Sequence, residues 1–481
     1  MMAVEGKRQK ALFFIHNYND IDHLTPVVDT LMRQGGWDCS LVFYPAHTLG
    51  SVRLAEDWRL CYLRDTWGVT VEQIDTIDPA FSWSLKLLDL RNALTGWCDK
   101  TPFLGRLFGR DVRGLLPWFL LWRYFDSVLN LWFKHLSPTG RRLWARYAPD
   151  VVVIDWGRTH LLLHPLLALA RKKGVRVLQL PHGAWTYEGI FSHESQFDPA
   201  KLSKKGRTPD TDPDVMVVDN LYKAVRTKYQ GLRFDQMRFL GLARFTPQWL
   251  KTVTSMSRAQ VKLAGTGKPR LVWFTTWLMA CDRQAVIDTL AALERYADRL
   301  DIILKVHTRN PAHEVNDYGR LLPADTRIRI VANEEDSLAM TAWCDYVLIT
   351  QSSIVYDAFV LRKPVISLQY THNFTCMWDA DGVGEGISST VDIEKLLAKI
   401  ADGDYVSSYS EVDIQRYLRL AVYGGLDGEQ VLSTYCELFD QAAAGRPLSA
   451  GLTFEQTIDL WKNEHRVIAP AVRDLLDPPS H

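Results

Sequence analysis

The sequence DIILKVHTRNP at residues 301–311 and the sequence YVLITQSSIVYDAFVLRKPVISL at residues 346–368 decide the predicted fold. Their apolar, β-branched runs at 301–306 and 346–349 are typical of buried strands. Each run ends in polar residues, which are Lys305, His307 and Arg309 after the first and Thr350, Gln351, Ser352 and Ser353 after the second. Because ligands of an open parallel α/β sheet bind beyond the carboxyl ends of its strands, we expect these side chains to share one edge. That edge is the candidate site.

Length and composition set limits on the class of protein. A chain of 481 residues can form two or three domains, each with its own core. Fifty-six basic residues balance fifty-six acidic ones, so no overall field favours nucleic acid as a partner. The seven cysteines are scattered without a CxxC pair, which argues against a disulfide framework or a zinc site and fits the cytoplasm. No run of eighteen apolar residues is present, so no transmembrane helix is predicted.

Predicted strands and helices alternate along two parts of the chain. Residues 11–45 read as strand, helix and strand without a GxGxxG fingerprint, and the same alternation resumes near residue 150. This pattern is typical of doubly wound parallel sheets. We therefore predict an α/β protein with two Rossmann-like domains facing across a cleft: an N-terminal acceptor domain at 1–245 and a C-terminal nucleotide-donor domain at 246–440, followed by a helical tail at 441–481.

A tryptophan-rich segment interrupts the first domain. Eight of the seventeen tryptophans lie between Trp58 and Trp144, where strand-like alternation is weak, so we predict a helical insertion at about 50–148. Two interpretations remain open. The helices can pack into a subdomain of their own, or an amphipathic face can rest on the inner face of the cell membrane, where Trp and Arg lie at the headgroup level.

The two strand ends carry groups suited to phosphate. The turn of Gln351, Ser352 and Ser353 opens a predicted helix, whose free N–H groups and positive dipole end bind phosphate; the alternative is that Ser352 caps the helix. Lys305 and His307 fall on one face of a strand and can stabilise a diphosphate leaving group. The alternative is a loop histidine beside a lysine with a structural role. Donor-binding residues are also predicted where the first strand of this domain ends in a polar turn, at Thr275 and Thr276.

The first domain offers groups for proton transfer and for the acceptor. Asp155 follows a predicted strand, and His182 lies in the turn LPHGAW, where an imidazole suits a general base. Each has a structural alternative, as a helix cap or a turn residue. The acceptor side is predicted to include Asn17, His23 and Glu188.

The motifs KVHTRNP and ITQSSIVYDAFVLRKPVI, with LPHGAW and YGGLDGEQVLSTYCELF, resemble patches of a known superfamily between residues 150 and 440. They look like the K-x-H-P, [TS]-x-S-S-x-x-x-[DE]-A, Q-H-G-x-W and D-G-x-[AS] signatures of GT-B-type transferases of bacterial surface polymers. These include CDP-glycerol glycerophosphotransferases of teichoic acid synthesis, polysialyltransferases and capsular or lipopolysaccharide Kdo transferases. The resemblance implies that His307, Ser352 and Ser353 hold the donor phosphates, supported by Lys305 and Arg309. Thr308 departs from the pattern, since the family usually has Pro there.

These observations together predict a glycosyltransferase. The expected reaction moves a sugar from a nucleotide-activated donor, such as CMP-Kdo, to a bacterial surface polysaccharide or lipopolysaccharide. Alternatives are glycerophosphate transfer from CDP-glycerol, a hydrolytic or epimerising reaction that needs added carboxylates around the sugar, and an inactive binding protein. The D-x-D triplets at 379–381 and 402–404 are weak metal signals, so no cofactor and no essential metal are predicted. Expected partners are the nucleotide sugar, a glycan or glycolipid acceptor and a peripheral contact with the membrane.

Overall fold

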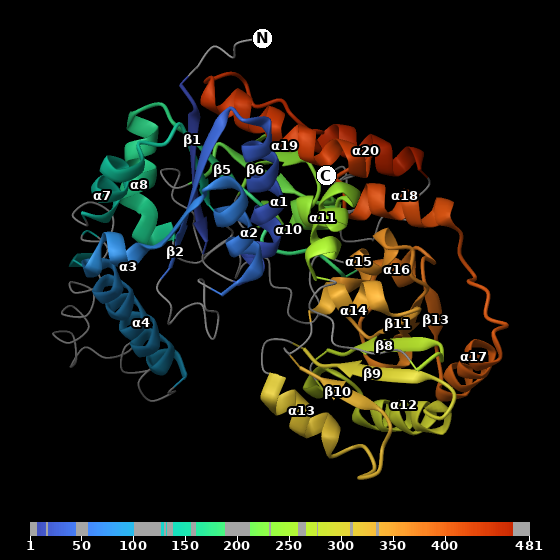
Figure 1. The fold of residues 1–481 in the computed structure, drawn as a ribbon. Coiled ribbons are helices and arrows are strands. Elements are labelled where there is room, and N and C mark those ends of the chain that lie inside the picture. Colours follow the sequence, from blue (N-terminus) through green and yellow to red (C-terminus); the bar gives the residue numbers. More distant parts are fainter. Residues whose placement is uncertain are drawn as a thin grey trace, which may run out of the picture. The chain divides into compact units, whose positions relative to one another are not determined.

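A computed structural model shows two α/β units, each built on a parallel sheet (Figure 1). Unit 1 comprises residues 1–182, 206–217 and 435–450, and unit 2 comprises residues 183–205, 218–434 and 451–481. The structure describes residues 7–15, 18–44, 56–100, 127–128, 131, 138–154, 160–187, 212–229, 232–257, 266–276, 278–307, 311–332 and 336–464. The predicted α/β class with two Rossmann-like halves is confirmed, while a cleft between them stays a prediction.

The first sheet has seven strands in the order β3-β2-β1-β4-β5-β6-β7. Its strands are β1 (Gln9–Ile15), β2 (Trp37–Phe43), β3 (Thr70–Gln73), β4 (Val151–Ile154), β5 (Arg176–Gln179), β6 (Val215–Val218) and β7 (Met237–Phe239). β1 runs parallel to β2 on one side and to β4 on the other, with Phe13 opposite Leu41 and Val153. The carboxyl-terminal parts of β1 and β2 and the whole of β4 and β6 are apolar, because both faces of a parallel sheet are covered.

Successive side chains of β1 serve two different cores. Leu12 and Phe14 pack with helices α7 (Thr139–Tyr147) and α8 (His160–Lys172) in one buried cluster. Phe13 points to the other face, where it stacks on Phe439 of α19 (Gly428–Ala443), with ring centroids 5.7 Å apart. Side chains of a strand alternate with period two, so one apolar run anchors helices on both faces.

The carboxyl-terminal helices divide between the two units. Trp37 donates from Nε1 to Asp440 of α19 over 3.1 Å, which together with Phe439 ties residues 435–450 to unit 1. α20 (Phe454–Asn463) packs on unit 2, where Trp461 meets Tyr222 edge-on at 5.7 Å. The predicted boundary at 245 and the separate tail at 441–481 therefore differ from the observed units, because aromatic contacts over long sequence separations decide where these helices lie.

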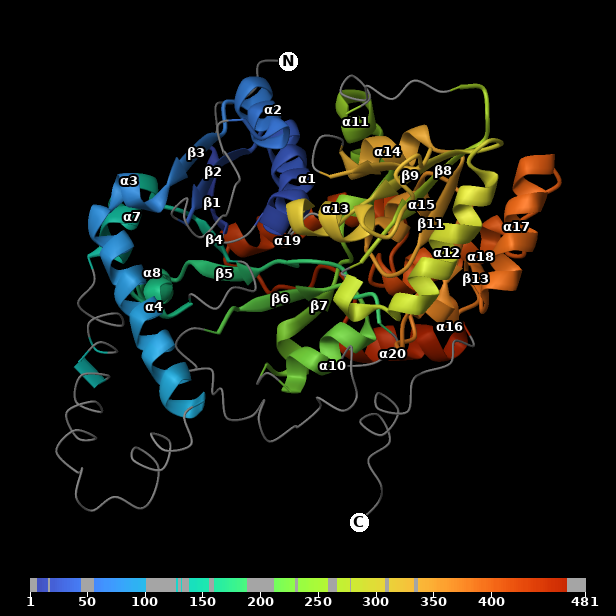
Figure 2. The same cartoon turned by 90° about the horizontal axis from the view of Figure 1, so that it is seen from below.

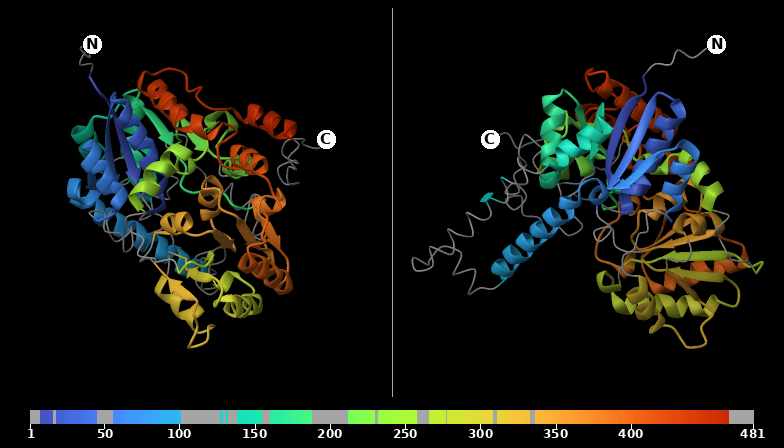
Figure 3. Two further views of the ribbon diagram at one scale, coloured as in Figure 1. Left: turned by 45° about the vertical axis from the view of Figure 1, so that its right-hand side comes forward. Right: turned by 60° about the vertical axis from the view of Figure 1, so that its left-hand side comes forward.

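The tryptophan-rich segment is helical where it is described, with one exception. It contains α2 (Trp58–Trp67), α3 (Ile74–Ile77) and α4 (Pro79–Lys100), and Figure 3 shows α4 projecting away from the strands of unit 1. The exception is β3, which pairs with β2 at the edge of the sheet. Four residues, TVEQ, are too few to show the alternation by which a strand is recognised.

The second sheet has six strands in the order β10-β9-β8-β11-β12-β13. They are β8 (Arg270–Phe274), β9 (Asp301–Lys305), β10 (Arg329–Val331), β11 (Tyr346–Ile349), β12 (Val365–Leu368) and β13 (Glu385–Ile387). All paired neighbours are parallel, and β8 lies between β9 and β11 (Figure 2). The strand order reverses beside β8, which makes the carboxyl ends of β8, β9 and β11 a topological switch point.

Helices complete unit 2. α12 (Arg283–Tyr296) and α17 (Thr390–Asp402) share one buried cluster with the sheet residues Leu271, Trp273 and Leu304. The others are α10 (Leu221–Tyr229), α11 (Pro247–Ser257), α13 (Pro311–Gly319), α14 (Ser337–Trp343), α15 (Ile354–Val360), α16 (Met377–Ala380), α18 (Glu411–Ala421) and the short helices η5 (Phe234–Gln236), η6 (Ala243–Phe245), η8 (Leu278–Ala280) and η9 (Gln369–Thr371). Among the described helices, none is both long enough and apolar enough to cross a membrane.

Candidate functional site

Three strand ends meet at the switch point of unit 2. The Thr275 N–H, after β8, donates to the carbonyl of Lys305 at the end of β9 over 3.1 Å. On the other side of β8, Trp273 donates from Nε1 to the Thr350 hydroxyl, which follows β11, over 3.0 Å. These hydrogen bonds fix the polar turns after β8, β9 and β11 side by side. The shared edge predicted from the two sequence stretches is therefore present.

The turn Gln351–Ser353 joins β11 to α15. All three residues are half-buried. The Ser352 hydroxyl accepts a long hydrogen bond of 3.4 Å from the Ile354 N–H, whereas the Ser353 side chain makes no capping bond. Helix capping thus accounts weakly for Ser352 and does not account for Ser353. Its predicted role in binding the donor stays a prediction.

The end of β9 places its two basic residues differently. Lys305 is 2% exposed, and its ammonium donates to the carbonyl of Ala332, just beyond β10. His307 is half-buried, beyond the last residue of the strand. Lys305 therefore has a structural partner inside unit 2, and a direct contact with phosphate stays a prediction for both residues. Thr276, also predicted here, is 7% exposed, and its carbonyl accepts from the Tyr318 hydroxyl over 3.3 Å.

A short segment after His182, residues 185–187, is fastened to this edge from within unit 2. The Tyr356 hydroxyl of α15 donates to the Trp185 carbonyl over 2.7 Å. The Thr186 hydroxyl accepts a hydrogen bond from the Gln351 side chain over 2.9 Å. The Thr186 carbonyl accepts another from the Met377 N–H, also over 2.9 Å. The LPHGAW turn and the turn Gln351–Ser353, called the QSS turn from here on, are far apart in the sequence. Hydrogen bonds through residues 185–187 connect them. His182 itself is half-buried and ends unit 1.

His372 is a candidate that the sequence analysis missed. It follows β12, is 7% exposed, and stacks on Phe374 with ring centroids 4.1 Å apart. Phe374 in turn meets Tyr187 edge-on at 5.4 Å. Burial lowers the pKa of His372, while backbone groups of Phe374 and Thr350 act in the opposite direction, so the imidazole is neutral near pH 7. Its place after a buried strand, the same signal that selected His307, identifies it in the sequence.

Buried carboxyl groups form a second feature that was missed. Asp219, directly after β6, is 1% exposed and accepts from the Trp185 N–H over 3.2 Å. Burial raises the pKa of Asp219 to about 6, and the charge of Lys223 opposes the shift. Glu314 of α13 is 6% exposed, and burial raises its pKa while a backbone contact with Leu278 opposes the shift. Carboxyl groups with raised pKa values suit proton transfer.

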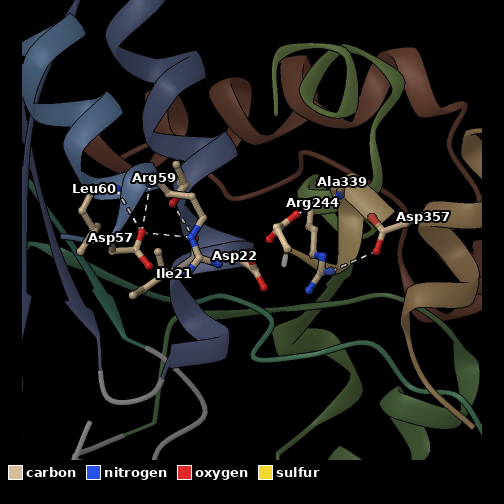
Figure 4. Close-up of polar contacts among 10 residues, drawn as sticks. Ile21, Asp22, Asp57, Arg59, Leu60, Arg244, Ala339 and Asp357 are labelled. Carbon is tan, nitrogen blue, oxygen red and sulfur yellow. Dashed lines mark hydrogen bonds and ion pairs between the residues drawn. The ribbon is translucent and has the colours of Figure 1, made fainter. Parts of the chain in front are cut away.

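Ion pairs brace both units (Figure 4). In unit 2, Asp357 of α15 is 1% exposed and pairs with Arg244 of η6 over 3.0 Å. In unit 1, Arg59 pairs with Asp57 over 2.6 Å and also with Asp22 of α1 (Tyr18–Gln34). The Arg244 pair fixes the first turn of α15 directly after the QSS turn.

Of the remaining predicted residues, the structure describes only His23. His23, assigned to the acceptor side, is buried in α1 with 5% exposure. Four residues with predicted roles fall outside the described ranges, namely Asn17, Asp155, Glu188 and Arg309. Within the described residues, no three His, Cys, Asp or Glu side chains are placed to hold a metal ion. That the reaction needs no metal stays a prediction.

Comparisons with known proteins support the architecture. Neither a protein-family model nor a curated protein matches the sequence. A UDP-GlcNAc 2-epimerase of Methanocaldococcus jannaschii matches 89% of this chain and 99% of its own at 11% identity, with a TM-score of 0.50. Another UDP-N-acetylglucosamine 2-epimerase, at 12% identity, and a Listeria monocytogenes protein assigned the same activity, at 10%, each match 93% of this chain and 100% of their own, also at 0.50. The fold is GT-B-like.

The predicted glycosyltransferase function is corrected by these matches. The three structures are described as 2-epimerases of a nucleotide sugar, and epimerisation passes no sugar to an acceptor. Likewise, the resemblance to capsular, teichoic acid, Kdo and sialic acid transferases holds only for the GT-B superfamily. The reason is physical: the K-x-H and S-S motifs mark a strand edge suited to nucleotide binding, and that edge does not reveal what happens to the sugar.

Proposed function

We propose that the protein is an enzyme that binds a nucleotide sugar at the carboxyl edge of the second sheet and epimerises the sugar. The observation that carries this proposal is the switch point beside β8, where the turns holding Thr275, His307 and Ser352–Ser353 are fixed next to one another. Hydroxyl and imidazole groups at such an edge are donors for the oxygens of a diphosphate. The GT-B-like fold shared with 2-epimerases of UDP-GlcNAc supports the same class of substrate.

Buried carboxyl groups favour epimerisation over transfer. Inversion of a carbon by proton exchange uses a base that removes the proton and an acid that returns one to the opposite face. Burial raises the pKa of Asp219 to about 6 and also raises the pKa of Glu314, a direction that favours proton exchange by both carboxyls. The reaction balances without a second substrate, since the proton lost from one face is replaced on the other.

The choice of test substrate follows from the proposed reaction. UDP-N-acetylhexosamines are the first substrates to test, because the matched structures are epimerases of UDP-GlcNAc. No cofactor is proposed. A peripheral contact with a membrane is a separate matter and rests on other residues, those of α4.

The test is an exchange experiment on the full-length protein. UDP-GlcNAc and UDP-glucose are incubated with the enzyme in deuterium oxide and followed by proton NMR. We expect the signal of the proton at the inverted carbon to disappear as the signals of the epimer grow. The Glu314→Gln variant should lower this rate by about 100-fold while leaving UDP binding intact, because general acid–base groups contribute 10²–10⁴ in rate.

Two results speak against the proposal. If no UDP, CMP, CDP, GDP or dTDP compound raises the melting temperature, the edge does not bind nucleotides, since a ligand of the folded state stabilises it by mass action. If UDP binds but neither exchange nor epimer is detected with UDP sugars, binding stands and epimerisation of these sugars is excluded.

A further inference from the structure

Helix α4 has apolar side chains on two opposite faces. Its inner face carries Phe81 and Leu85, which are 1% and 3% exposed and belong to the buried cluster of unit 1. Its other face carries Trp83, Leu87 and Leu90, which are 70%, 37% and 53% exposed. A helix that serves only the core of its own unit has a polar outer face. The outer apolar residues of α4 therefore need another explanation.

The three exposed side chains form one stripe. They stand at positions i, i+4 and i+7, so at about 100° per residue they fall within an arc of roughly 60°. Lys86 borders the stripe, with its ammonium 5.4 Å from the centre of the Trp83 ring. We call Trp83, Lys86, Leu87 and Leu90 the α4 outer face. α4 projects away from the strands of unit 1 (Figure 3), and this face lies in the first half of the helix.

Charge and composition identify what covers this face. Tryptophan beside lysine over leucines matches the headgroup level of a bilayer, where the ring and the ammonium stay near water while the leucines enter the acyl region. The sequence that follows, residues 101–126, has seven aromatic residues and four arginines against two aspartates. The chain as a whole has no net charge, so Lys86 beside the stripe, together with the excess of arginine in the sequence after the helix, favours anionic lipid over a neutral surface.

We propose that the α4 outer face is a peripheral docking surface for an anionic lipid membrane. The proposal is independent of the reaction at the second sheet. It assigns the contact to four side chains of one helix and explains why that helix is apolar on both sides. A single helix of this kind gives reversible attachment, strengthened by the charge of the lipid.

The experiment uses the full-length protein and vesicles of phosphatidylcholine, with or without about one third phosphatidylglycerol. Wild type should co-sediment with the anionic vesicles and much less with the neutral ones. The triple variant Trp83→Glu, Leu87→Glu, Leu90→Glu should bind at least tenfold more weakly. A matched control places three glutamates at exposed valines elsewhere, Val391, Val406 and Val412, and should bind as wild type does. Trp83→Ser alone should give an intermediate loss.

Other outcomes overturn the proposal. The α4 outer face is not a lipid-binding surface if wild type and the triple variant bind anionic vesicles equally well. The same conclusion holds if wild type does not bind anionic vesicles at all. If the triple variant melts several degrees lower than the valine control, the face is covered by the chain itself. If wild type is a dimer in solution and the triple variant a monomer, a second copy covers it.

Discussion

The side-chain amide of Gln351 donates a hydrogen bond to the hydroxyl of Thr186, with Nε2 and Oγ1 2.9 Å apart. Gln351 begins the turn that carries the two candidate serines, and Thr186 belongs to a segment that reaches unit 2 from the end of unit 1. One hydrogen bond therefore connects the two polar turns that the sequence separates by 165 positions. This hydrogen bond orients the QSS turn through a residue that belongs neither to β11 nor to α15, the two elements that the turn connects.

Removing this hydrogen bond should weaken nucleotide binding. We expect Thr186→Val to lower affinity for UDP by about fivefold, because a typical hydrogen bond contributes about 1 kcal/mol. Gln351→Ala should have a similar effect, and the double variant should show less than the sum of the two, which titration calorimetry can measure. The matched control is Gln284→Ala. The Gln284 amide donates to Asp288 on the exposed face of α12, so its loss should leave affinity unchanged. If the losses of affinity in the two single variants simply add in the double variant, Thr186 does not act through Gln351.

Ser353 and Ser410 offer a paired test of ligand binding against helix capping. Ser353 makes no capping bond, so Ser353→Ala should reduce UDP affinity about tenfold and leave the free energy of unfolding nearly unchanged. Ser410 caps α18 in a capping box, so Ser410→Ala should destabilise by about 1 kcal/mol without altering affinity. Binding titrations and urea unfolding of both variants give the comparison. Normal affinity in the Ser353 variant would remove that hydroxyl from the site.

The Arg244–Asp357 pair should be costly to break from one side. Arg244→Ala leaves the Asp357 carboxylate, 1% exposed, without its cation, and we expect a loss of about 3 kcal/mol in the free energy of unfolding. The double variant Arg244→Met, Asp357→Leu should recover much of that loss, because no charge is then buried. Arg299→Ala breaks the exposed pair with Asp402 and should change stability by about 0.5 kcal/mol or less in the same urea titrations. A small effect of Arg244→Ala would show that the carboxylate has sufficient other partners.

Asp219 should give the protein a specific dependence of stability on pH. Its pKa is raised from 3.8 to about 6, so the folded state holds this proton more tightly than the unfolded chain does. Its stabilising contribution is therefore complete below pH 3.8 and is lost as pH rises through 6. Lys223, with a pKa lowered to about 8 by burial, stays charged across this window.

The measurement compares wild type with Asp219→Asn by urea unfolding from about pH 4 to pH 7. The stability of wild type should fall relative to the variant by roughly 2.5 kcal/mol over this range, since each pKa unit corresponds to 1.36 kcal/mol and most of the shift is lost between these pH values. Parallel curves for the two proteins across this range would show that the Asp219 carboxyl keeps an ordinary pKa.

The sequence by itself determined the strands and the polar residues at their ends. The runs at 301–306 and 346–349 are apolar and β-branched, and that property is local, so β9 and β11 could be predicted with the turns that follow them. The rule that parallel strands end at a common edge then brought His307 and Ser352 to the same side of one sheet. The α/β class followed from the same alternation.

Only the tertiary structure decided which polar groups are buried and which unit each helix joins. Asp219, Glu314 and His372 gain their properties from burial by residues distant in sequence, and no local pattern reports burial of a single polar side chain. Lys305 shows the same limit: its strand position suggests a ligand, and only the structure reveals that its ammonium also donates to the carbonyl of Ala332. α19 reaches unit 1 through Phe439 and Phe13, a contact between rings more than 400 positions apart. Local preferences give the elements, and long-range packing and desolvation give the site.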